Sequence, residues 1–210
     1  MKKIVFIGGK GLSLQIASWM SLEKKDFKIL GVYDDESVSK SSFKIKGKIK
    51  DLKVSKNIRY YLTLGDPFLR KKIYLYLKKK HKNLIFSNFI FKNSLISEKK
   101  LFADKEGLII GPNCLAEKFT NVGRCCILNA HSSLFHEVQI GDFCTLAPYS
   151  SAMGGSSLGD CVLLGAHSSV NPQKKISNNI ILGSHGNAVH DLKKSGVYVG
   201  NPAKRIKDLF

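Results

Sequence analysis

The chain has 210 residues, 43% apolar and 24% charged, enough for one large or two small domains with buried cores. A disordered or collagen-like chain is excluded. The formal net charge is +18, and residues 1–110 hold 25 Lys and Arg against 10 Asp and Glu, whereas residues 111–210 hold 9 against 6. Most of these cations are lysines, which fits a solvated surface, so we expect no nucleic-acid partner.

Neither a targeting segment nor a cysteine framework is evident. The first residues, MKKIVFIGGKGLS, hold only about six apolar residues before Lys10, and no later run approaches the ~18 residues of a membrane span. We therefore expect a cytoplasmic protein. Cysteines stand at positions 114, 125, 126, 144 and 161 without a CxxC pair. This spacing favours reduced, structural thiols over disulfides or a zinc ribbon.

The first half alternates strand and helix signals. The predicted strands are 3–7, 29–33, 58–64 and 84–89, and the predicted helices are 14–20 and 67–80. Pro67 suits the first turn of the second helix. These elements predict a small βαβαβ unit whose parallel strands carry a ligand site at their carboxyl ends.

The second half has a period of six. Every sixth residue is apolar over Ile110, Ala116, Val122, Leu128, Leu134, Ile140, Leu146, Ala152, Leu158, Leu164, Val170, Ile176, Leu182 and Ala188. Four residues after most of these lies a small or compact side chain, such as Cys114, Ser132 or Ser150. A large residue alternating with a small one in this way predicts a solenoid coil with three flat faces.

Segments 140–144 (IGDFC), 158–162 (LGDCV) and 164–168 (LGAHS) resemble the hexapeptide-repeat family of left-handed parallel β-helices. Three hexads make one coil of eighteen residues, so residues 110–190 supply between four and five coils. The left hand is implied by the resemblance, because the usual crossover rule would predict the opposite.

The order of the two halves, closed by GNPAKRI at 200–206, resembles the bacterial sugar acyltransferases that act on nucleotide-linked amino sugars. The resemblance is most specific over residues 127–141. It implies a Rossmann-like nucleotide-sugar-binding domain over 1–94 and a left-handed β-helix acyltransferase domain over 95–210. It also implies acetyl-CoA as co-substrate, no metal, and a homotrimer with the coenzyme A groove between neighbours.

The reaction that this resemblance implies is N-acetylation of a nucleotide-linked amino sugar for a surface glycan. Two alternatives remain open: an O-acetyltransferase for a sialic-acid-like sugar, and a non-catalytic nucleotide-sugar-binding protein. The sequence departs from the family's usual histidines at Leu12 and Thr145, from its HP dipeptide at 91–92, and from its usual acidic residue at Phe135. These departures concern the acceptor more than the reaction type.

For the reaction itself, the resemblance assigns the general base to His136. A neutral imidazole is a natural proton acceptor for an attacking amine, and Glu137 is the local carboxylate that could orient the ring. Adding one coil of eighteen residues to His136 leads to Gly154, whose backbone N–H could meet a thioester oxygen. Thr145 and Ser184 are further expected contacts of coenzyme A.

Histidines spaced one or two coils apart also suggest a metal site. His131, His136 and His167 partly match the zinc spacing of gamma-class carbonic anhydrases, but position 172, where another ligand is needed, is Pro172. We therefore expect no metal, and expect His131, His167 and His185 to line a corner of the coil with Tyr149.

In the first half, glycines and aspartates follow the predicted strands. Backbone N–H groups at a Gly8–Gly11 turn could meet a pyrophosphate, and Asp34 or Asp35 could accept from a ribose or a base. The missing third glycine argues against a dinucleotide. The resemblance assigns a nucleotide-linked sugar to this pocket, which the expected contacts Gly8, Gly11, Asp34, Asp35, Gly65 and Arg70 would line.

Overall fold

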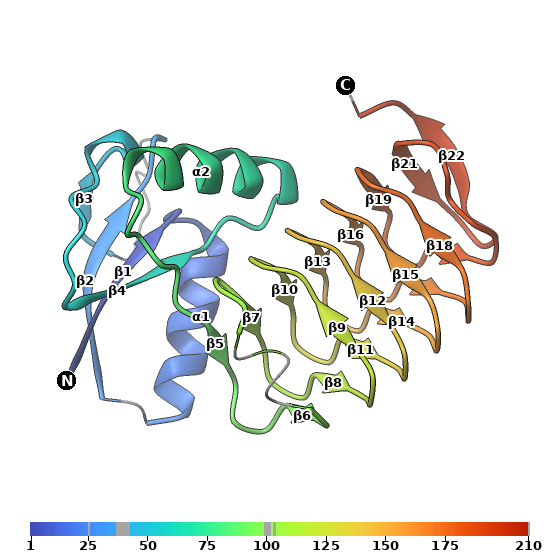
Figure 1. The fold of residues 1–210 in the computed structure, drawn as a ribbon, viewed down its shortest axis with the longest axis horizontal. Helices are drawn as coiled ribbons and strands as arrows, with labels where there is room; N and C mark the ends of the chain where they lie inside the picture. Colours follow the sequence, from blue (N-terminus) through green and yellow to red (C-terminus); the bar gives the residue numbers. More distant parts are fainter. Residues whose placement is uncertain (25, 37–42, 99–101, 103, 210) are drawn as a thin grey trace.

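The computed structural model describes residues 1–24, 26–36, 43–98, 102 and 104–209. The chain forms an α/β part followed by a parallel β-helix that extends away from it (Figure 1). This is the architecture that the two sequence patterns predict.

The α/β part is a parallel sheet of four strands in the order β3-β2-β1-β4. Its strands are β1 (Lys2–Ile7), β2 (Phe27–Tyr33), β3 (Ile45–Gly47) and β4 (Ile58–Leu62), and its helices are α1 (Gly11–Leu22), the short 3-10 helix η1 (Ile49–Asp51) and α2 (Pro67–Lys80). Asp66 caps α2 because its carboxylate accepts from the Leu69 N–H at 2.7 Å. The predicted bounds of α2 are confirmed, whereas α1 is longer than predicted and β3 was not predicted.

The predicted strand at 84–89 is wrong. Only Phe86 bridges to Tyr60 of the α/β sheet. The next strand, β5 (Phe89–Ile90), pairs with the β-helix instead. The first β-helix strand therefore begins before residue 95, where we placed the domain boundary. Phe89 is 3% exposed. Its apolar side chain could be buried equally well in the α/β sheet or in the β-helix, so hydrophobicity alone does not predict which sheet the strand joins.

Three sheets of short strands form the faces of the β-helix. Face 1 contains β5, β7 (Ile109–Ile110), β10 (Ile127–Leu128), β13 (Thr145–Leu146), β16 (Leu163–Leu164), β19 (Ile180–Leu182), β21 (Gly196–Val199) and β22 (Lys204–Lys207). Face 2 contains β6 (Leu95–Ile96), β8 (Leu115–Ala116), β11 (Ser133–Leu134), β14 (Ser151–Ala152), β17 (Ser169–Val170) and β20 (Asn187–Ala188). Face 3 contains β9 (Asn121–Val122), β12 (Gln139–Ile140), β15 (Ser157–Leu158) and β18 (Lys175–Ile176).

The predicted eighteen-residue coil is confirmed by the strand register. Leu128 pairs with Leu146 and Leu146 with Leu164, and all three point inward with 0% exposure. The small column fills the spaces between them: Ser150, for example, is fully buried and its hydroxyl donates to the Ala147 carbonyl at 2.7 Å. Alternating large and small interior residues thus close the prism, and most of the buried hydroxyls in the small column find a backbone carbonyl, whereas that of Ser156 finds no partner among the described residues.

Three corners join the faces, and each contains a residue with positive φ in most coils. The His131 corner joins faces 1 and 2 and includes Asn113, His131, Tyr149, His167 and His185. The His136 corner joins faces 2 and 3 and includes Phe119, Glu137, Gly155 and Gln173. The Cys125 corner joins faces 3 and 1 and includes Cys125, Phe143, Cys161 and Asn179.

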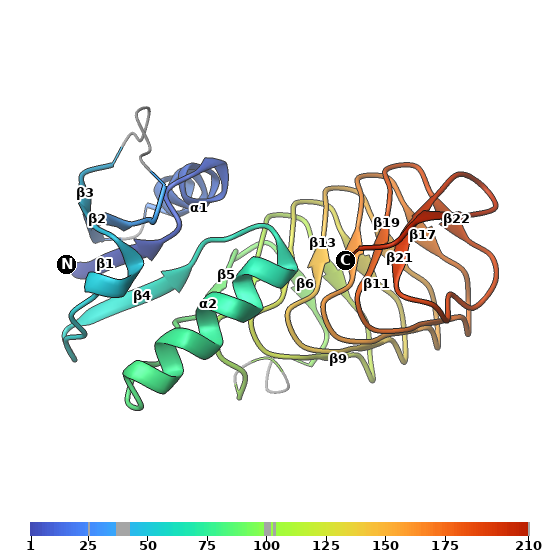
Figure 2. The same ribbon diagram turned by 90° about the horizontal axis from the view of Figure 1, so that it is seen from above.

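The α/β part packs on face 1. The outward side chains of Ile109 and Ile127 are each 1% exposed, because they lie in one apolar cluster with residues of α1 and β1. The Trp19 ring of α1 stacks on Phe89 with ring centroids 6.3 Å apart. On face 3 the outward Gln139 is exposed instead. Figure 2 shows α1 and α2 at the same end of the β-helix.

A second contact joins α2 to the Cys125 corner through Arg70. This arginine is 0% exposed and has no carboxylate partner among the residues that the structure describes. Its guanidinium donates instead to the carbonyl oxygens of Cys125, Leu64, Gly65, Phe143 and Cys144 and to Oγ1 of Thr145, over 2.6–3.1 Å. Oxygen dipoles from both parts of the chain therefore stabilise one buried positive charge.

Replacing this charge should destabilise the junction. We expect Arg70→Ala to lower the free energy of unfolding by ~3–5 kcal/mol, because several buried carbonyls lose their donor. The matched control is Lys71→Ala: Lys71 is partly exposed and pairs with Asp160 at 3.8 Å, so the expected loss is below ~1 kcal/mol. Denaturant unfolding followed by circular dichroism measures both, and equal losses would contradict the assignment.

Candidate active site

His136 and Glu137 form a hydrogen-bonded contact at the His136 corner. Nδ1 of His136 lies 3.0 Å from Oε2 of Glu137, and both side chains are exposed. Neighbouring residues on an extended strand would point to opposite sides. Here Glu137 has φ +63°, and this left-handed turn brings the two side chains together. The expected contact between these residues is present.

Glu117, in the preceding coil, also holds this corner. Its Oε2 accepts from the backbone N–H of His136 at 2.9 Å. The sequence analysis missed Glu117, although one coil separates it from Phe135, the position where an acidic residue was expected. An eighteen-residue search for carboxylates next to His136 would have found it. Glu117 thus places a second carboxylate beside His136 from the neighbouring coil.

Gly154 lies directly against the imidazole. A Cβ added at Gly154 would be 2.5 Å from both Cε1 and Nε2 of His136. The neighbouring Gly155 N–H donates to the His136 carbonyl at 2.9 Å, which continues the backbone hydrogen bonds between successive coils. Within the described part of the chain, the Gly154 N–H itself donates no hydrogen bond. An unpaired backbone donor and a ring nitrogen thus lie side by side at an exposed corner, which suits a polar ligand.

Thr145 and Ser184, expected to contact coenzyme A, lie apart from His136. Thr145 is 8% exposed on face 1, where its hydroxyl donates to the Gly65 carbonyl at 3.0 Å and accepts from Arg70. The Thr145 hydroxyl is thus engaged at the junction with the α/β part, and its position does not support the expected contact with coenzyme A. Ser184 is exposed, next to His185 at the His131 corner.

Two of the predicted nucleotide-binding residues close the first turn of the α/β part. Gly8 has φ +102°, and a side chain there would overlap Leu64. The Asp34 carboxylate is almost buried and accepts from the backbone N–H groups of Gly9 and Glu36 at 2.7 and 3.0 Å. These contacts give both residues a role in shaping the turn.

Gly11, Asp35 and Gly65 are the open positions at the carboxyl ends of β1, β2 and β4. An added Cβ at Gly11 or Gly65 would meet no atom within 4 Å. Asp35 is exposed and one oxygen accepts from the Ile49 N–H at 2.8 Å, while no residue that the structure describes donates to the other. Arg70 does not join them, because its whole guanidinium is engaged in the buried junction. The expected contact of Arg70 with a nucleotide is therefore not supported by its position.

The rings of the His131 corner form a stacked column. Centroids of His131, Tyr149, His167 and His185 follow one another at 4.6, 4.8 and 5.1 Å, with planes within 5° of parallel. This matches the expected lining of a corner. His131 and His136 lie on different corners, and the described residues contain no group of three His, Cys, Asp or Glu side chains that could hold a metal ion.

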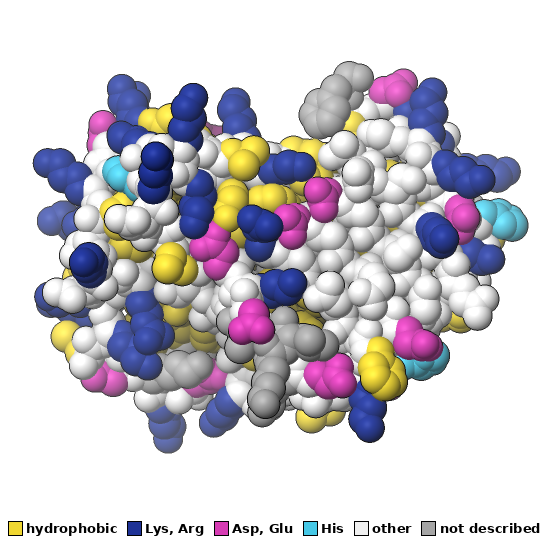
Figure 3. Space-filling model, in the orientation of Figure 1, with side chains coloured by type: hydrophobic (Ala, Val, Ile, Leu, Met, Phe, Trp, Pro, Cys, Tyr) yellow, Lys and Arg dark blue, Asp and Glu magenta, His cyan; other side chains and the backbone are white. Residues whose placement is uncertain are grey.

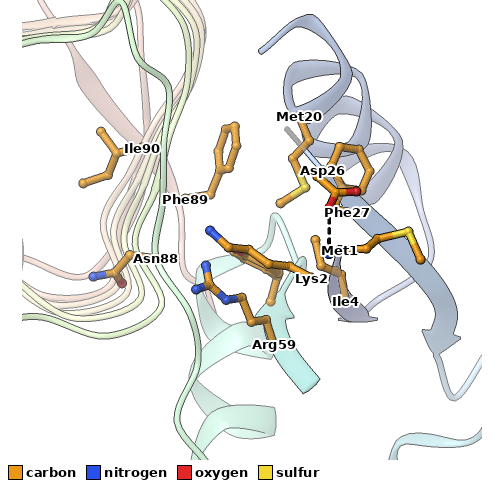
Figure 4. Close-up of a pocket in the computed structure, with 11 residues that line it drawn as sticks. Met1, Lys2, Ile4, Met20, Asp26, Phe27, Arg59, Asn88, Phe89 and Ile90 are labelled. Carbon is orange, nitrogen blue, oxygen red and sulfur yellow. Dashed lines mark ion pairs between the residues drawn. The ribbon is translucent and has the colours of Figure 1, made fainter. Parts of the chain in front are cut away.

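A pocket of about 400 Å³ lies at the amino ends of the α/β strands, where none of the predicted site residues is found (Figure 4). Met20, Phe27 and Phe89 form its apolar side, and Lys2 and Arg59 extend from β1 and β4. Ligands of parallel sheets bind at the carboxyl ends of the strands, so this pocket is not part of the candidate site.

Comparison with known proteins finds the same fold over almost the whole chain. Perosamine N-acetyltransferase from Caulobacter crescentus, solved as a histidine-substituted mutant in complex with CoA and GDP-perosamine, matches with a TM-score of 0.78 and 23% identity, over 98% of this chain and 97% of that chain. The acetyltransferase domain of PglB from Neisseria gonorrhoeae matches with a TM-score of 0.78 and 16% identity, over 98% and 100% of the two chains.

WeeI from Acinetobacter baumannii AYE is also similar, with a TM-score of 0.72 and 19% identity over 97% of this chain and 99% of that chain. At these identities the matches define the fold. No family model matches the sequence, and none of the curated proteins compared with it does. No helix within the described ranges is long and apolar enough to cross a membrane.

The contact between Gly154 and His136 can be tested directly. We expect Gly154→Ala to displace the imidazole, because the new methyl group would occupy its position, while changing the free energy of unfolding by less than ~1 kcal/mol since the ring is exposed and can move. Proton NMR of the His136 ring and thermal melting measure the two effects. An unchanged His136 resonance would contradict the geometry.

Proposed function

We propose that this protein is an acetyl-CoA-dependent N-acetyltransferase that acts on the amino group of a nucleotide-linked amino sugar. The observation that carries the proposal is the alignment of Glu137, His136 and the free N–H of Gly154 at one exposed corner. The shared fold supports it, since C. crescentus perosamine N-acetyltransferase is solved with CoA and GDP-perosamine and the PglB domain with acetyl coenzyme A.

The Glu137 carboxylate decides which ring nitrogen acts as the base. Its Oε2 accepts a hydrogen bond from Nδ1–H, which leaves Nε2 of a neutral imidazole unprotonated, on the ring edge that lies beside Gly154. As the sugar amine attacks the thioester carbonyl carbon, Nε2 accepts the proton that the amine loses.

Gly154 then stabilises the charge that the attack creates. Negative charge grows on the thioester oxygen, and the unpaired Gly154 N–H can donate to it. When the intermediate collapses, the C–S bond breaks, the amide forms, and the thiolate of coenzyme A takes the proton held by His136. The products are the N-acetyl sugar and free coenzyme A.

The position of the α/β part implies that the acceptor comes from another copy of the chain. In a three-sided prism each corner lies opposite one face, and the His136 corner, which joins faces 2 and 3, lies opposite face 1. The α/β part with Gly11, Asp35 and Gly65 packs on face 1. The body of the β-helix therefore separates the two sites within one chain. We propose a homotrimer in which neighbouring copies complete each site.

A cytoplasmic location is part of the proposal. All five cysteines are buried free thiols. Burial raises the pKa values of Cys125, Cys144 and Cys161, so these thiols stay protonated and unreactive. Reduced structural thiols are typical of proteins that work in a reducing compartment.

Substitution of the base tests the reaction. We expect His136→Asn to lower kcat by ~10²–10⁴ with little change in coenzyme A affinity, because the ring acts on the acceptor proton. Glu137→Gln should reduce kcat less, in the same direction. The measurement is coenzyme A thiol release with nucleotide-linked amino sugars, and with hydroxyl-bearing sugars as a second acceptor class. Full activity in His136→Asn, or turnover of hydroxyl acceptors only, would overturn the proposal.

A mixing experiment tests whether the site is shared. Gly11→Trp should block the open turn at the start of α1 and raise the acceptor KM, whereas His136→Asn should abolish the chemistry. In trimers assembled from equal amounts of both impaired chains, and assayed at an acceptor concentration well below the raised KM, about a quarter of the sites would combine two intact parts and recover activity. Trimers of each variant alone are the controls. Absence of recovery in verified mixed trimers would place both parts of the site in one chain.

A further inference from the structure

The positive charge of the first half gathers in a short stretch of the chain. Between Lys44 and Lys82 the sequence has 12 lysines and only two acidic residues, Asp51 and Asp66. Figure 3 shows lysine and arginine side chains crowded over the α/β part, with hydrophobic side chains among them, whereas the middle of the visible side of the β-helix is mostly uncharged and its edges carry acidic and basic side chains together. The proposed acyl transfer uses none of these lysines.

The solvent-facing side of helix α2 is both apolar and basic. Its inward residues Arg70, Ile73, Tyr74 and Leu77 follow the spacing i, i+3, i+4, i+7 and are buried. The outward residues Lys72, Leu75, Tyr76 and Lys79 follow the same spacing on the opposite side. Leu75 is 55% exposed and Tyr76 is 43% exposed, although burying their apolar surface would lower the free energy.

Two further lysines extend this surface. Lys48 and Lys50, beside β3 and in η1, line one pocket of about 370 Å³ together with Lys72 and Tyr76. The Lys80 ammonium donates to the Lys50 carbonyl, which places the end of α2 beside η1. We define the basic face as Lys48, Lys50, Lys72, Leu75, Tyr76, Lys79 and Lys80.

The charges of the basic face are not neutralised within the chain. None of its lysines has a carboxylate partner within salt-bridge distance among residues 1–24, 26–36, 43–98, 102 and 104–209. Lys71 and Lys78, on the flanks of α2, are paired with Asp160 and Glu106. Asp35, the acidic residue that lines the same pocket, already accepts from Ile49. The outward side of α2 therefore presents unpaired cations around exposed apolar side chains.

We propose that the basic face binds the anionic headgroups of a lipid bilayer and that Leu75 and Tyr76 insert at the interface. Lysines attract acidic lipids at close range, and a leucine and a tyrosine on a helix surface suit the boundary between headgroups and acyl chains. A nucleic acid fits less well, because the basic face contains no arginine, Tyr76 is its one aromatic ring, and the neighbouring exposed side chain is the aliphatic Leu75. The interaction is peripheral, and its lysines Lys48, Lys50 and Lys72 share a pocket with Asp35, an open position of the candidate nucleotide site.

Charge reversal on the face tests this proposal against a matched control. We expect the wild-type chain to co-sediment with vesicles of phosphatidylglycerol and phosphatidylethanolamine at about 0.1 M salt, and not with phosphatidylcholine alone. Lys72→Glu combined with Lys79→Glu should weaken this partitioning by ~10-fold or more. Lys193→Glu combined with Lys194→Glu changes the net charge equally at exposed positions of the β-helix and should have little effect.

A third variant separates insertion from simple attraction. Leu75→Ser combined with Tyr76→Ser keeps every charge and should also weaken partitioning, because the interfacial apolar contact is lost. Circular dichroism melting checks that each variant folds, as expected for outward side chains. The proposal is overturned if the wild-type chain does not bind anionic vesicles, if both charge-reversal variants lose binding equally, or if the serine variant binds unchanged. Tighter binding to single-stranded RNA than to vesicles, lost in Lys72→Glu with Lys79→Glu, would also overturn it.

Discussion

The parallel ladder with its eighteen-residue register is the interaction on which the remainder of the structure depends. Each coil pairs with the next through backbone hydrogen bonds, so residues one coil apart lie about 4.7–4.9 Å from each other. That spacing stacks Tyr149 on His131 and places Gly154 against His136. A glycine is needed there, because any Cβ would occupy the position of the imidazole. The same repeat that builds the core therefore positions the candidate base beside a backbone donor.

The second constraint is the way in which the α/β part covers face 1. Ile109 and Ile127 are apolar on their outward side, and covering them removes that surface from water. Arg70 fixes the orientation of the two parts at this contact, because its guanidinium donates directional hydrogen bonds to carbonyl oxygens of both. Packing on face 1 leaves the His136 corner exposed on the far side of the prism. A site that needs both the open turn at Gly11 and the imidazole of His136 is then incomplete in a single chain.

Several sequence-based predictions for individual residues differ from the structure, because a side chain's partners depend on the direction in which it points and on residues that are distant in the sequence. Arg70 lies in the first turn of α2, shortly after a strand, where an arginine can bind a ligand, but its side chain points into the junction. Thr145 was expected to contact coenzyme A, yet its hydroxyl bonds to Gly65 at the junction. Glu117 was missed because it is distant from His136 in sequence and adjacent only through the coil. The apolar segment at 84–89 could pair with either sheet, and only packing decides between them.

The sequence by itself determined the local structure: the period of six, the eighteen-residue coil, the bounds of α2, and the neighbouring positions of His136, Glu137 and Gly154. These follow from short-range rules, since strand pairing and side-chain size repeat at fixed intervals. Only the tertiary structure decided which face the α/β part covers, that Arg70 is buried, and that Leu75 and Tyr76 stand exposed among unpaired lysines on the basic face. These depend on contacts between residues far apart in the chain, which no periodicity encodes.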